Sequence, residues 1–241
     1  MKISVVVPAF NEERLLPESL PSIRAAMQAF ERRGWASELI VCDNNSTDRT
    51  AEIARAAGAR VVFEPVNQIS RARNTGAAQA GGDWIVFVDA DSRPSVELFT
   101  DAADAIAGGR CLAGGSTVAY PNPPAAAALI IGMWNALSRL ARWAAGSFIF
   151  CEAAAFRAVG GFSEQLYASE EVELSRRLKR LARRGGRTIV ILHRHPLLTS
   201  DRKLRLYGWG RLAWFMLKTI ASGGRTLRSR EDCFAWYDGK R

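Results

Sequence analysis

The sequence predicts an α/β protein with a mostly parallel central sheet that is flanked by helices. Short apolar runs of strand length alternate with helical patterns through the first hundred residues. These runs are continuously apolar, which is typical of strands that helices cover on both faces. The order strand, helix, strand, helix favours parallel strands joined by right-handed crossovers.

The first hundred residues hold four expected strands and three expected helices. The strands are the β-branched or aromatic runs at 3–7, 38–42, 60–63 and 84–88. Apolar residues spaced by three and four predict the first helix from Leu16 to Phe30. The second helix is expected to be capped by Ser46 or Thr47 and to end before Gly58. The third is expected over residues 70–80.

The rest of the chain is less regular. Helical patterns occupy residues 95–108, a stretch that ends at Ala145, a short segment before Gly160 and Gly161, and residues 169–184. Strand-like runs lie at 110–120, 147–151 and 187–192, and a proline-rich loop lies at 121–124. Because no repeat or linker interrupts these patterns, we expect one domain with a basic, helical C-terminal extension from about residue 196.

The positive charge is concentrated at the C-terminal end. The net charge is +9, but residues 1–175 hold 15 Lys and Arg against 20 Asp and Glu, whereas residues 176–241 hold 18 against 4. Such a basic region suits a phosphate-bearing ligand, an anionic membrane or nucleic acid. The alternative is a solvated surface whose arginines lie along it with their charged ends in water.

Cysteine usage and the N-terminal residues favour a cytoplasmic protein. The four cysteines are widely spaced, without a zinc-binding pattern, so we expect buried, reduced thiols. The N-terminal apolar run is too short for a signal peptide. The longest apolar stretch, 125–137, is soon interrupted by Arg139 and Arg142, so we expect no membrane span.

Polar residues follow three of the predicted strands at the point where each strand ends. They are the runs "PAFNEE" (8–13), "DNNSTD" (43–48) and "DADS" (89–92). The loops at the carboxyl ends of parallel strands meet in one crevice, where ligands bind. Asp89 and Asp91, one residue apart, supply hard oxygen ligands suited to Mg²⁺ or Mn²⁺. The alternative is a turn in which Asp91 or Ser92 caps the next helix.

Four stretches resemble, in order and spacing, the motifs of family-2 glycosyltransferases: "SVVVPAFNEE" (4–13), "VCDNNSTDRT" (41–50), "SRARNTGAAQAGGDWIVFVDADS" (70–92) and "GGFSEQLYASEEVELSRRLKR" (160–180). The resemblance covers residues 3 to about 184. It implies the GT-A fold, with a Rossmann-like sheet, in which residues 1–94 bind the nucleotide and 95–195 the acceptor, leaving 196–241 as the basic extension. It also implies sugar transfer with inversion from a nucleotide-sugar donor, expected to be UDP-linked. A divalent cation, Mg²⁺ or Mn²⁺, would bridge the donor's diphosphate, with Asp91 as the more direct ligand and Asp89 in contact with ribose or metal.

The resemblance also assigns nucleotide-binding roles. Asp43 would accept a hydrogen bond from the base imide, as in enzymes that read uracil. Arg71 would face the base or the diphosphate, with Arg73 and Asn74 in support. For Glu12 and Asp43, the alternative is that they are solvated loop acids. For Arg71 and Arg73, the alternative is that they merely open a helix. The remaining residues expected to border the nucleotide are Pro8, Ala9, Glu12 and Ala90.

A pair of glutamates lies where the family carries its catalytic base. Inverting transfer needs a carboxylate that removes the acceptor's proton on the side opposite the leaving diphosphate. The family has Glu-Asp at the start of the helix after "GGF", with the Asp as base, and this chain has Glu170-Glu171. Glu171 is therefore the expected base, one methylene longer, and Glu170 is its rival. Two acids there would also be favoured by the helix dipole alone.

Two features near the last predicted strand are further candidates. His193 or His195 could complete the metal site, as a C-terminal His does in some GT-A enzymes, or could be a hydrogen-bonded structural residue. The run "TSDRK" (199–203) offers hydroxyls and two cations for a pyrophosphate, or is an exposed turn.

The partners other than the donor stay open. Residues 204–216 mix aromatic and basic side chains, which suits either a membrane interface or a helix packed on the catalytic core. The acceptor is therefore lipid-linked or a small molecule, and we expect a cytoplasmic enzyme with peripheral contact at the inner membrane face. The alternative is a non-catalytic nucleotide- or anion-binding relative that uses the basic C-terminal region. No nucleic acid is expected, because no nucleic-acid-binding module is recognisable.

Overall fold

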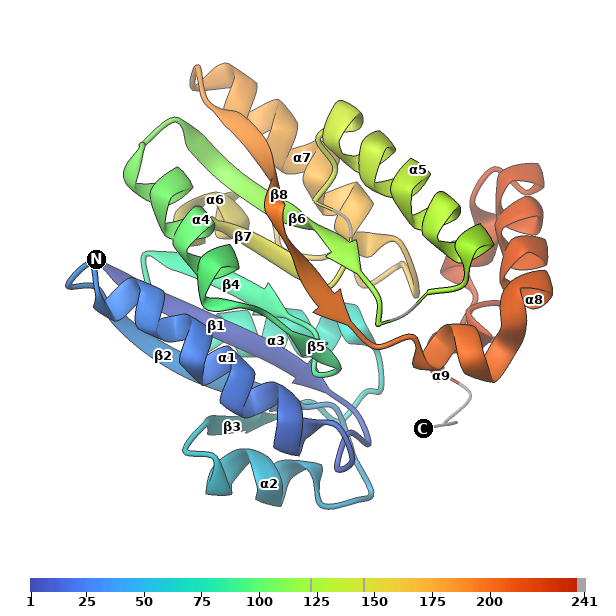
Figure 1. Cartoon of the computed structure of the whole chain (residues 1–241), viewed down its shortest axis with the longest axis horizontal. Helices are drawn as coiled ribbons and strands as arrows, with labels where there is room; N and C mark the ends of the chain where they lie inside the picture. The colour runs from blue at the N-terminus through green and yellow to red at the C-terminus, as the bar shows by residue number, and fades with distance from the viewer. Residues whose placement is uncertain (122, 145, 238–241) are drawn as a thin grey trace.

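The computed structural model describes residues 1–121, 123–144 and 146–237, and within them eight strands form one sheet in the order β3-β2-β1-β4-β7-β6-β8-β5 (Figure 1). Six strands share one direction, whereas β5 and β7 run the opposite way. The mostly parallel sheet is thus confirmed. The strands are β1 (Lys2–Ala9), β2 (Ala36–Asp43), β3 (Arg60–Phe63), β4 (Trp84–Val88), β5 (Ser92–Arg93), β6 (Cys111–Ala119), β7 (Phe148–Glu152) and β8 (Thr188–Thr199).

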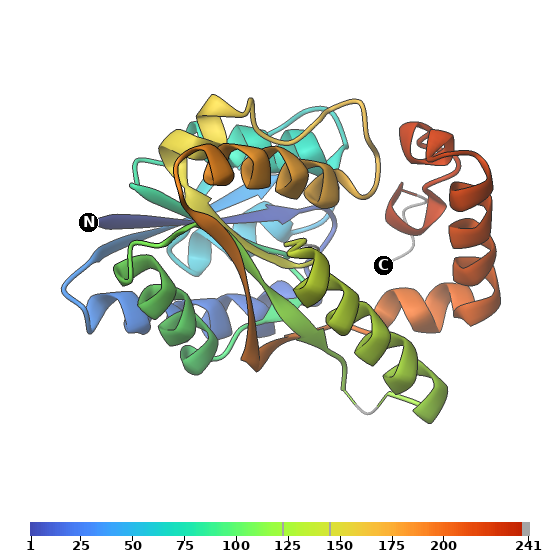
Figure 2. The same ribbon diagram turned by 90° about the horizontal axis from the view of Figure 1, so that it is seen from above.

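Helices cover both faces of the sheet, as the continuously apolar strands predict (Figure 2). One core lies between the sheet and α1, α2 and α4, and the other between the sheet and α3, α6 and α7. Along β1 the side chains alternate between the two cores, with Val5 and Val7 in the first and Val6 in the second. The helices are α1 (Leu16–Glu31), α2 (Thr50–Ala56), α3 (Ile69–Ala78), α4 (Val96–Ala107), α5 (Ala125–Ala141), α6 (Ala153–Ala158), α7 (Glu170–Arg184), α8 (Arg202–Ala221), the 3-10 helix η1 (Arg225–Arg228) and α9 (Phe234–Tyr237).

β3 lies at the edge of the sheet and pairs only with β2 among the described strands. Val61 packs against one core and Val62 against the other, as expected for a strand covered on both faces, whereas Phe63 at its end is 57% exposed.

The expected cap of α2 is corrected by the structure. The N-cap residue of α2 is Arg49, which forms no side-chain capping hydrogen bond, and the Oδ1 of Asp48 accepts the N–H of Thr50 at 2.9 Å. Ser46 instead accepts the N–H of Asn11 at 3.0 Å, because two loops of the sheet edge meet there. The expected helix end at Ala145 lies outside the described residues.

The C-terminal elements return to the carboxyl edge of the sheet. α8 bends at Gly208, where the backbone has φ 69° and ψ 161°, and the chain then turns back through η1 and α9 (Figure 2). The carbonyl of Leu227 accepts the N–H of Tyr167 at 2.7 Å. The hydroxyl of Tyr237 accepts the N–H of Ile69 at 3.3 Å. Residues of the C-terminal segment therefore contact the start of α3 and the loop before α7.

The thiols and the helix lengths complete the description of the fold. All four cysteines are buried and free, as expected from their spacing. In the described ranges, no helix is both long enough and apolar enough to cross a lipid bilayer.

Candidate active site

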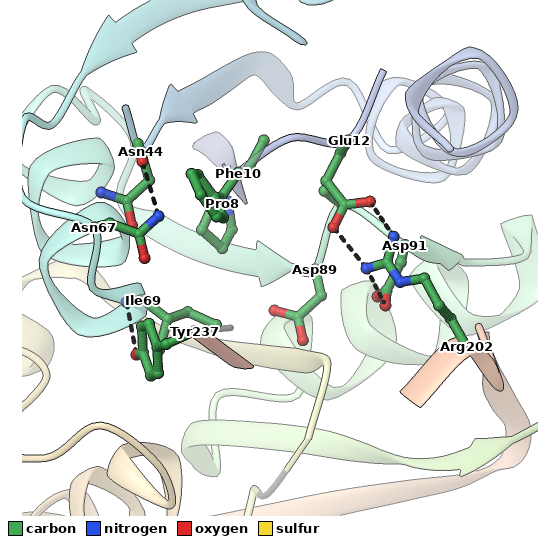
Figure 3. Close-up of a pocket in the computed structure, with 12 residues that line it drawn as sticks. Pro8, Phe10, Glu12, Asn44, Asn67, Ile69, Asp89, Asp91, Arg202 and Tyr237 are labelled. Atoms are coloured by element: carbon green, nitrogen blue, oxygen red, sulfur yellow. Dashed lines mark hydrogen bonds and ion pairs between the residues drawn. The ribbon is translucent and has the colours of Figure 1, made fainter. Parts of the chain in front are cut away.

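A cleft opens at the carboxyl ends of the strands, where β1, β2 and β4 end (Figure 3). The cavity volume within it is about 70 Å³. Segments far apart in sequence build it, because the loops after parallel strands converge on one edge. The cleft is lined by Pro8, Ala9, Phe10, Glu12, Asn44, Asn67, Ile69, Asp89, Ala90, Asp91, Arg202 and Tyr237.

The turn that carries Asp89 and Asp91 is held by backbone hydrogen bonds on both sides. The N–H of Asp89 donates to the carbonyl of Ser147, and the N–H of Ser92 donates back to the carbonyl of Asp89, each at 3.0 Å. The N–H of Ser200 donates to the carbonyl of Asp91 at 3.2 Å. Both carboxylates are thereby fixed on the wall of the cleft.

Arg73 connects this turn to the start of α7. Its Nη2 donates to Asp89 Oδ1 at 2.7 Å and its Nη1 to Glu170 Oε1 at 2.6 Å, while the guanidinium lies over the ring of Phe162. Arg73 and Glu170 are each only 3% exposed. Burial by itself lowers the pKa of Arg73, but the carboxylates of Asp89, Glu170 and Glu171 outweigh it and the pKa is raised. Arg73 is therefore a buried cation whose charge holds two acidic segments together.

The two glutamates at the start of α7 have different surroundings. Glu170 is paired with Arg73, whereas Glu171 forms no ion pair with any described side chain. Burial, and then the adjacent Glu170 carboxylate, raise the pKa of Glu171 from 4.5 to about 8. Ser169, which precedes the pair, has a left-handed backbone with φ 61°, a strained conformation that residues other than Gly adopt rarely. Glu171 is thus a carboxylate that takes up a proton near neutral pH.

The loop before α7 is fastened to α3 through Asn74. Its Nδ2 donates to the carbonyl of Phe162 at 2.9 Å, and its Oδ1 accepts the N–H of Phe162 at 2.8 Å. Gly161 has φ +68°, and a Cβ on it would lie 2.7 Å from Asn74 Oδ1. The second glycine of "GGF", Gly161, is therefore needed both for its backbone conformation and for its closeness to Asn74.

Gly161→Ala is expected to lower the free energy of unfolding by about 1–3 kcal/mol. The reason is that the new methyl group pushes the loop away from Asn74. Gly160→Ala is a matched control, because Gly160 also has a positive φ of +82° but open space around it. Urea denaturation of both variants checks this, and equal losses would contradict a specific role for the Asn74 contact.

Arg202 brings a cation into the cleft. Its two terminal nitrogens donate to the two carboxylate oxygens of Glu12 at 2.8 and 2.7 Å, and Nη2 lies 3.6 Å from Asp91 Oδ2 (Figure 3). Burial lowers the pKa of Arg202, but the hydrogen bonds and charge of Glu12, with Asp91, raise it overall. The residue belongs to the "TSDRK" run, so the structure brings that run to the cleft.

The residues expected to bind the nucleotide do not all lie in the cleft. Pro8, Ala9, Glu12, Asp89, Ala90 and Asp91 line it. Asp43 is buried at the end of β2, where its Oδ1 accepts the N–H of Ser46 at 3.0 Å, and its neighbour Asn44 lines the cleft instead. Arg71 is not among the lining residues, because its guanidinium pairs with Glu64 at 3.1 Å and Glu164 at 2.8 Å.

The two histidines lie away from the cleft. Nδ1 of His195 is 3.0 Å from Asp101 of α4. His193 lines a groove between α5 and β8. Neither lies among the residues that line the cleft with Asp89 and Asp91, and the contact of His195 with Asp101 fits the alternative of a hydrogen-bonded structural residue.

Several lining residues were missed by reasoning from the sequence. Phe10 and Asn44 lie within the motif stretches, so the position of these stretches at strand ends was a usable signal. Tyr237 had no such signal, because only the return of the C-terminal segment brings it to α3. Its pKa is raised by burial and then by the Glu170 carboxylate.

The acids of the cleft fit a divalent cation that shares its coordination with a ligand. Asp89 and Asp91 offer hard carboxylate oxygens on one wall, the donor type that Mg²⁺ and Mn²⁺ prefer. Within the described residues no three His, Cys, Asp or Glu side chains cluster as a complete metal site. A cation here would therefore need further oxygens from phosphate or water.

Relatives of the chain include glycosyltransferases of known and unknown specificity. An uncharacterised glycosyltransferase of Mycobacterium bovis is 40% identical over 89 residues, which cover 37% of this chain and 36% of that protein. The poly(ribitol-phosphate) β-N-acetylglucosaminyltransferase TarS of Staphylococcus aureus is 34% identical over 110 residues, covering 43% of this chain and 18% of that protein. The matches to these two thus span about a third and a fifth of the relatives' own length.

Solved structures share the fold. The crystal structure of Staphylococcus aureus TarS 1-349 with UDP-GlcNAc has a TM-score of 0.63 at 22% identity, over 88% of this chain and 65% of that one. Glucosyl-3-phosphoglycerate synthase of Mycobacterium tuberculosis, with Mn²⁺ and UDP-glucose, has a TM-score of 0.60 at 21% identity, over 92% and 78%. The sequence model described as "Glycosyl transferase family 2" matches residues 4–158, well over half of the chain. On the strength of that match, the protein belongs to glycosyl transferase family 2.

Proposed function

We propose that the protein is an inverting, metal-assisted glycosyltransferase that moves a sugar from a UDP-linked donor to an acceptor hydroxyl or phosphate. The observation that carries the proposal is the Arg73 bridge, which joins the acidic turn at Asp89 to Glu170 beside the cleft. An acidic turn and a second carboxylate pair are thereby held at one site. Metal-assisted transfer requires these two groups near a single substrate.

The donor nucleotide is assigned to the part of the cleft near β1 and β2. Pro8 and Ala9 would border the nucleoside, and Asp43 with Asn44 would meet the base. UDP as the nucleotide is supported by the TarS complex with UDP-GlcNAc and the synthase complex with UDP-glucose, which share the fold. Arg71 keeps a role here only if its pairing with Glu64 and Glu164 opens on donor binding.

The diphosphate is assigned to the wall that carries Asp89 and Asp91. These carboxylates would hold Mg²⁺ or Mn²⁺, which neutralises the leaving diphosphate when bound. The guanidinium of Arg202 adds positive charge on the same wall, where it balances Glu12 and faces Asp91. The synthase complex that contains Mn²⁺ supports a divalent cation in this fold.

Glu171 is assigned as the general base and Glu170 as its positioning neighbour. Glu170 is engaged by Arg73, so its charge is already used to hold the site together. Glu171 has no such partner among the described side chains, and its raised pKa makes its ionised form a stronger base towards the acceptor's proton. The acceptor would approach from the side of α7, opposite the diphosphate.

The acceptor is either lipid-linked or a small molecule, and we place the reaction on the cytoplasmic side of the membrane. Peripheral contact through the basic C-terminal region is part of this proposal, because residues 176–241 carry most of the positive charge. We also propose, from the resemblance to the family's motifs, that residues 1–94 bind the nucleotide, residues 95–195 bind the acceptor and residues 196–241 form the extension.

Asp91→Asn is expected to weaken UDP binding in the presence of Mn²⁺ by about tenfold or more, because a metal ligand of the diphosphate is lost. Binding measured with a chelator should be the same in both proteins. Asp104→Asn is the matched control, since Asp104 of α4 pairs with Arg33, just after α1, and neither residue lines the cleft. Calorimetry with UDP checks this, and metal-dependent binding that survives in Asp91→Asn would contradict the assigned metal site.

A non-catalytic relative is the second candidate, and one observation favours it. Glu171 replaces the aspartate that the family's pattern has as base, so the reacting carboxylate is one methylene longer. A panel of UDP-sugars separates the two functions. Metal-dependent UDP binding without sugar transfer or hydrolysis for any donor would favour the binding protein.

A further inference from the structure

The outer face of α5 exposes a stripe of large aliphatic side chains. They are between 45% and 86% exposed, and their spacing of three and four residues places them on one side of the helix. Soluble monomers seldom expose such a continuous apolar face, and a helix that is apolar on every side is normally covered. The stripe comprises Leu129, Ile130, Met133, Leu137 and Leu140.

Basic side chains surround the C-terminal end of α5. Lys179 donates to the carbonyl of Ala141 at 2.8 Å, and Arg176 lies over the ring of Trp143. Burial, and then the charges of Arg183 and Arg142, lower the pKa of Lys179, so these cations lie close together. Within the described part of the chain, none of them forms an ion pair with an acid. The group, here the α5 basic cluster, comprises Arg139, Arg142, Arg176, Lys179 and Arg183.

An apolar pocket runs from α5 towards the acidic turn. Ile130, Ile131 and Trp134 of α5 line it together with Tyr120 and Ser147. The carbonyl of Ser147 accepts the N–H of Asp89, and the charges of Asp91 and Asp89 act on Tyr120, so the lining of the pocket lies beside the acidic turn. An amphiphilic molecule with its apolar part below α5 would thus present its polar end to the cleft.

We propose that α5 is an interfacial helix that seats the protein on an anionic lipid bilayer. The aliphatic stripe would enter the boundary between headgroups and acyl chains, and the α5 basic cluster would meet the anionic headgroups. A second copy of the chain fits less well, because it brings the same cations and α5 has no acidic residue to pair with them. Resting on the proposed function, this orientation makes a membrane-embedded, amphiphilic acceptor the substrate class.

Vesicle co-sedimentation of the full chain tests the proposal. Vesicles of phosphatidylcholine with about 30% phosphatidylglycerol should bind the protein at least about tenfold more tightly than vesicles of phosphatidylcholine alone. The triple variant Leu129→Gln, Met133→Gln, Leu140→Gln should lose about tenfold or more of this binding. The matched control is Trp214→Gln, Leu217→Gln on α8, two exposed apolar residues that should be dispensable.

Three results would overturn the proposal. They are no preference for anionic vesicles, full vesicle binding by the α5 variant, or a loss of binding in the α8 variant as large as that expected for the α5 variant, which would move the apolar contact from α5 to α8. A wild-type dimer that the α5 variant converts to monomer, seen by sedimentation velocity without vesicles, would assign the face to self-association instead. UDP binding, measured by calorimetry on each variant, shows whether the variant is folded and keeps the proposed donor site. This measurement is independent of vesicle binding. Its absence in the wild type would contradict the proposed function and leave the vesicle result standing.

Discussion

Glu171→Gln should reduce the turnover number by about 10²- to 10⁴-fold, the usual contribution of a general base. The glutamine keeps the size and polarity of the side chain but cannot accept a proton. UDP affinity should stay within about twofold of wild type, because Glu171 is placed on the acceptor side of the cleft and not among its lining residues. Turnover assays with the UDP-sugar identified in the donor panel, together with calorimetry, measure both quantities.

Glu173→Gln is the matched control for this substitution. Glu173 also lies in the first turn of α7, but its carboxylate pairs with Arg177 on the same helix. If acids in this turn served only the helix dipole, the two variants would behave alike. A Glu171→Gln enzyme with turnover similar to that of the control would contradict the assignment and move the base to another residue.

The raised pKa of Glu171 also gives the substitution a signature in stability. The folded state binds the Glu171 proton more tightly than the unfolded state, so this proton stabilises the fold below about pH 4.5 and the stabilisation is lost as the pH rises through about 8. Glutamine lacks this dependence. Urea denaturation between pH 5 and pH 9, roughly the range between those pKa values, should show the variant gaining stability relative to wild type as the pH rises. The same titration should appear in wild type as a rate that increases with pH.

Arg73→Met should lower the free energy of unfolding by about 3–5 kcal/mol, the usual cost of removing one partner from a buried ion pair. The substitution leaves Glu170 buried without its cation and removes the ion pair of Asp89. The acidic turn and the start of α7 would then repel each other across the site, and turnover should be lost as well. Urea denaturation at pH 7 measures the stability loss.

Two comparisons separate the charge of Arg73 from its shape. Arg73→Lys keeps the charge but cannot reach both carboxylates with a planar fork, so it should restore only part of the stability. Arg71→Met is the control, since the Arg71 side chain is 35% exposed and pairs with Glu64 and Glu164 outside the cleft. It should cost about 1 kcal/mol or less. An Arg73→Met protein as stable as the Arg71 variant would show that the bridge is not what holds the two segments together.

The long apolar runs made the sheet predictable, and the places where prediction failed are local. The four N-terminal strands were found because covered parallel strands are continuously apolar. β3 was assigned to the sheet correctly but not to its edge, since strand order is set by which crossovers pack together. The cap of α2 was misplaced because the Ser46 hydroxyl is engaged by the Asn11 loop, and the helix begins later, after Arg49, where the side chain of Asp48 accepts the N–H of Thr50.

The sequence by itself determined the sheet, the convergence of three polar loops at its carboxyl edge, and the glutamate pair at the start of α7. These follow from patterns within a few residues, because periodicity and strand-end position are local properties. Tertiary structure alone decided that Arg73 joins Asp89 to Glu170, that Arg202 reaches Glu12 across 190 residues, and that Arg71 turns away to Glu64. The acid with which an arginine pairs depends on burial and on distance in the folded protein. Neither quantity can be read from the residues next to the arginine in the sequence.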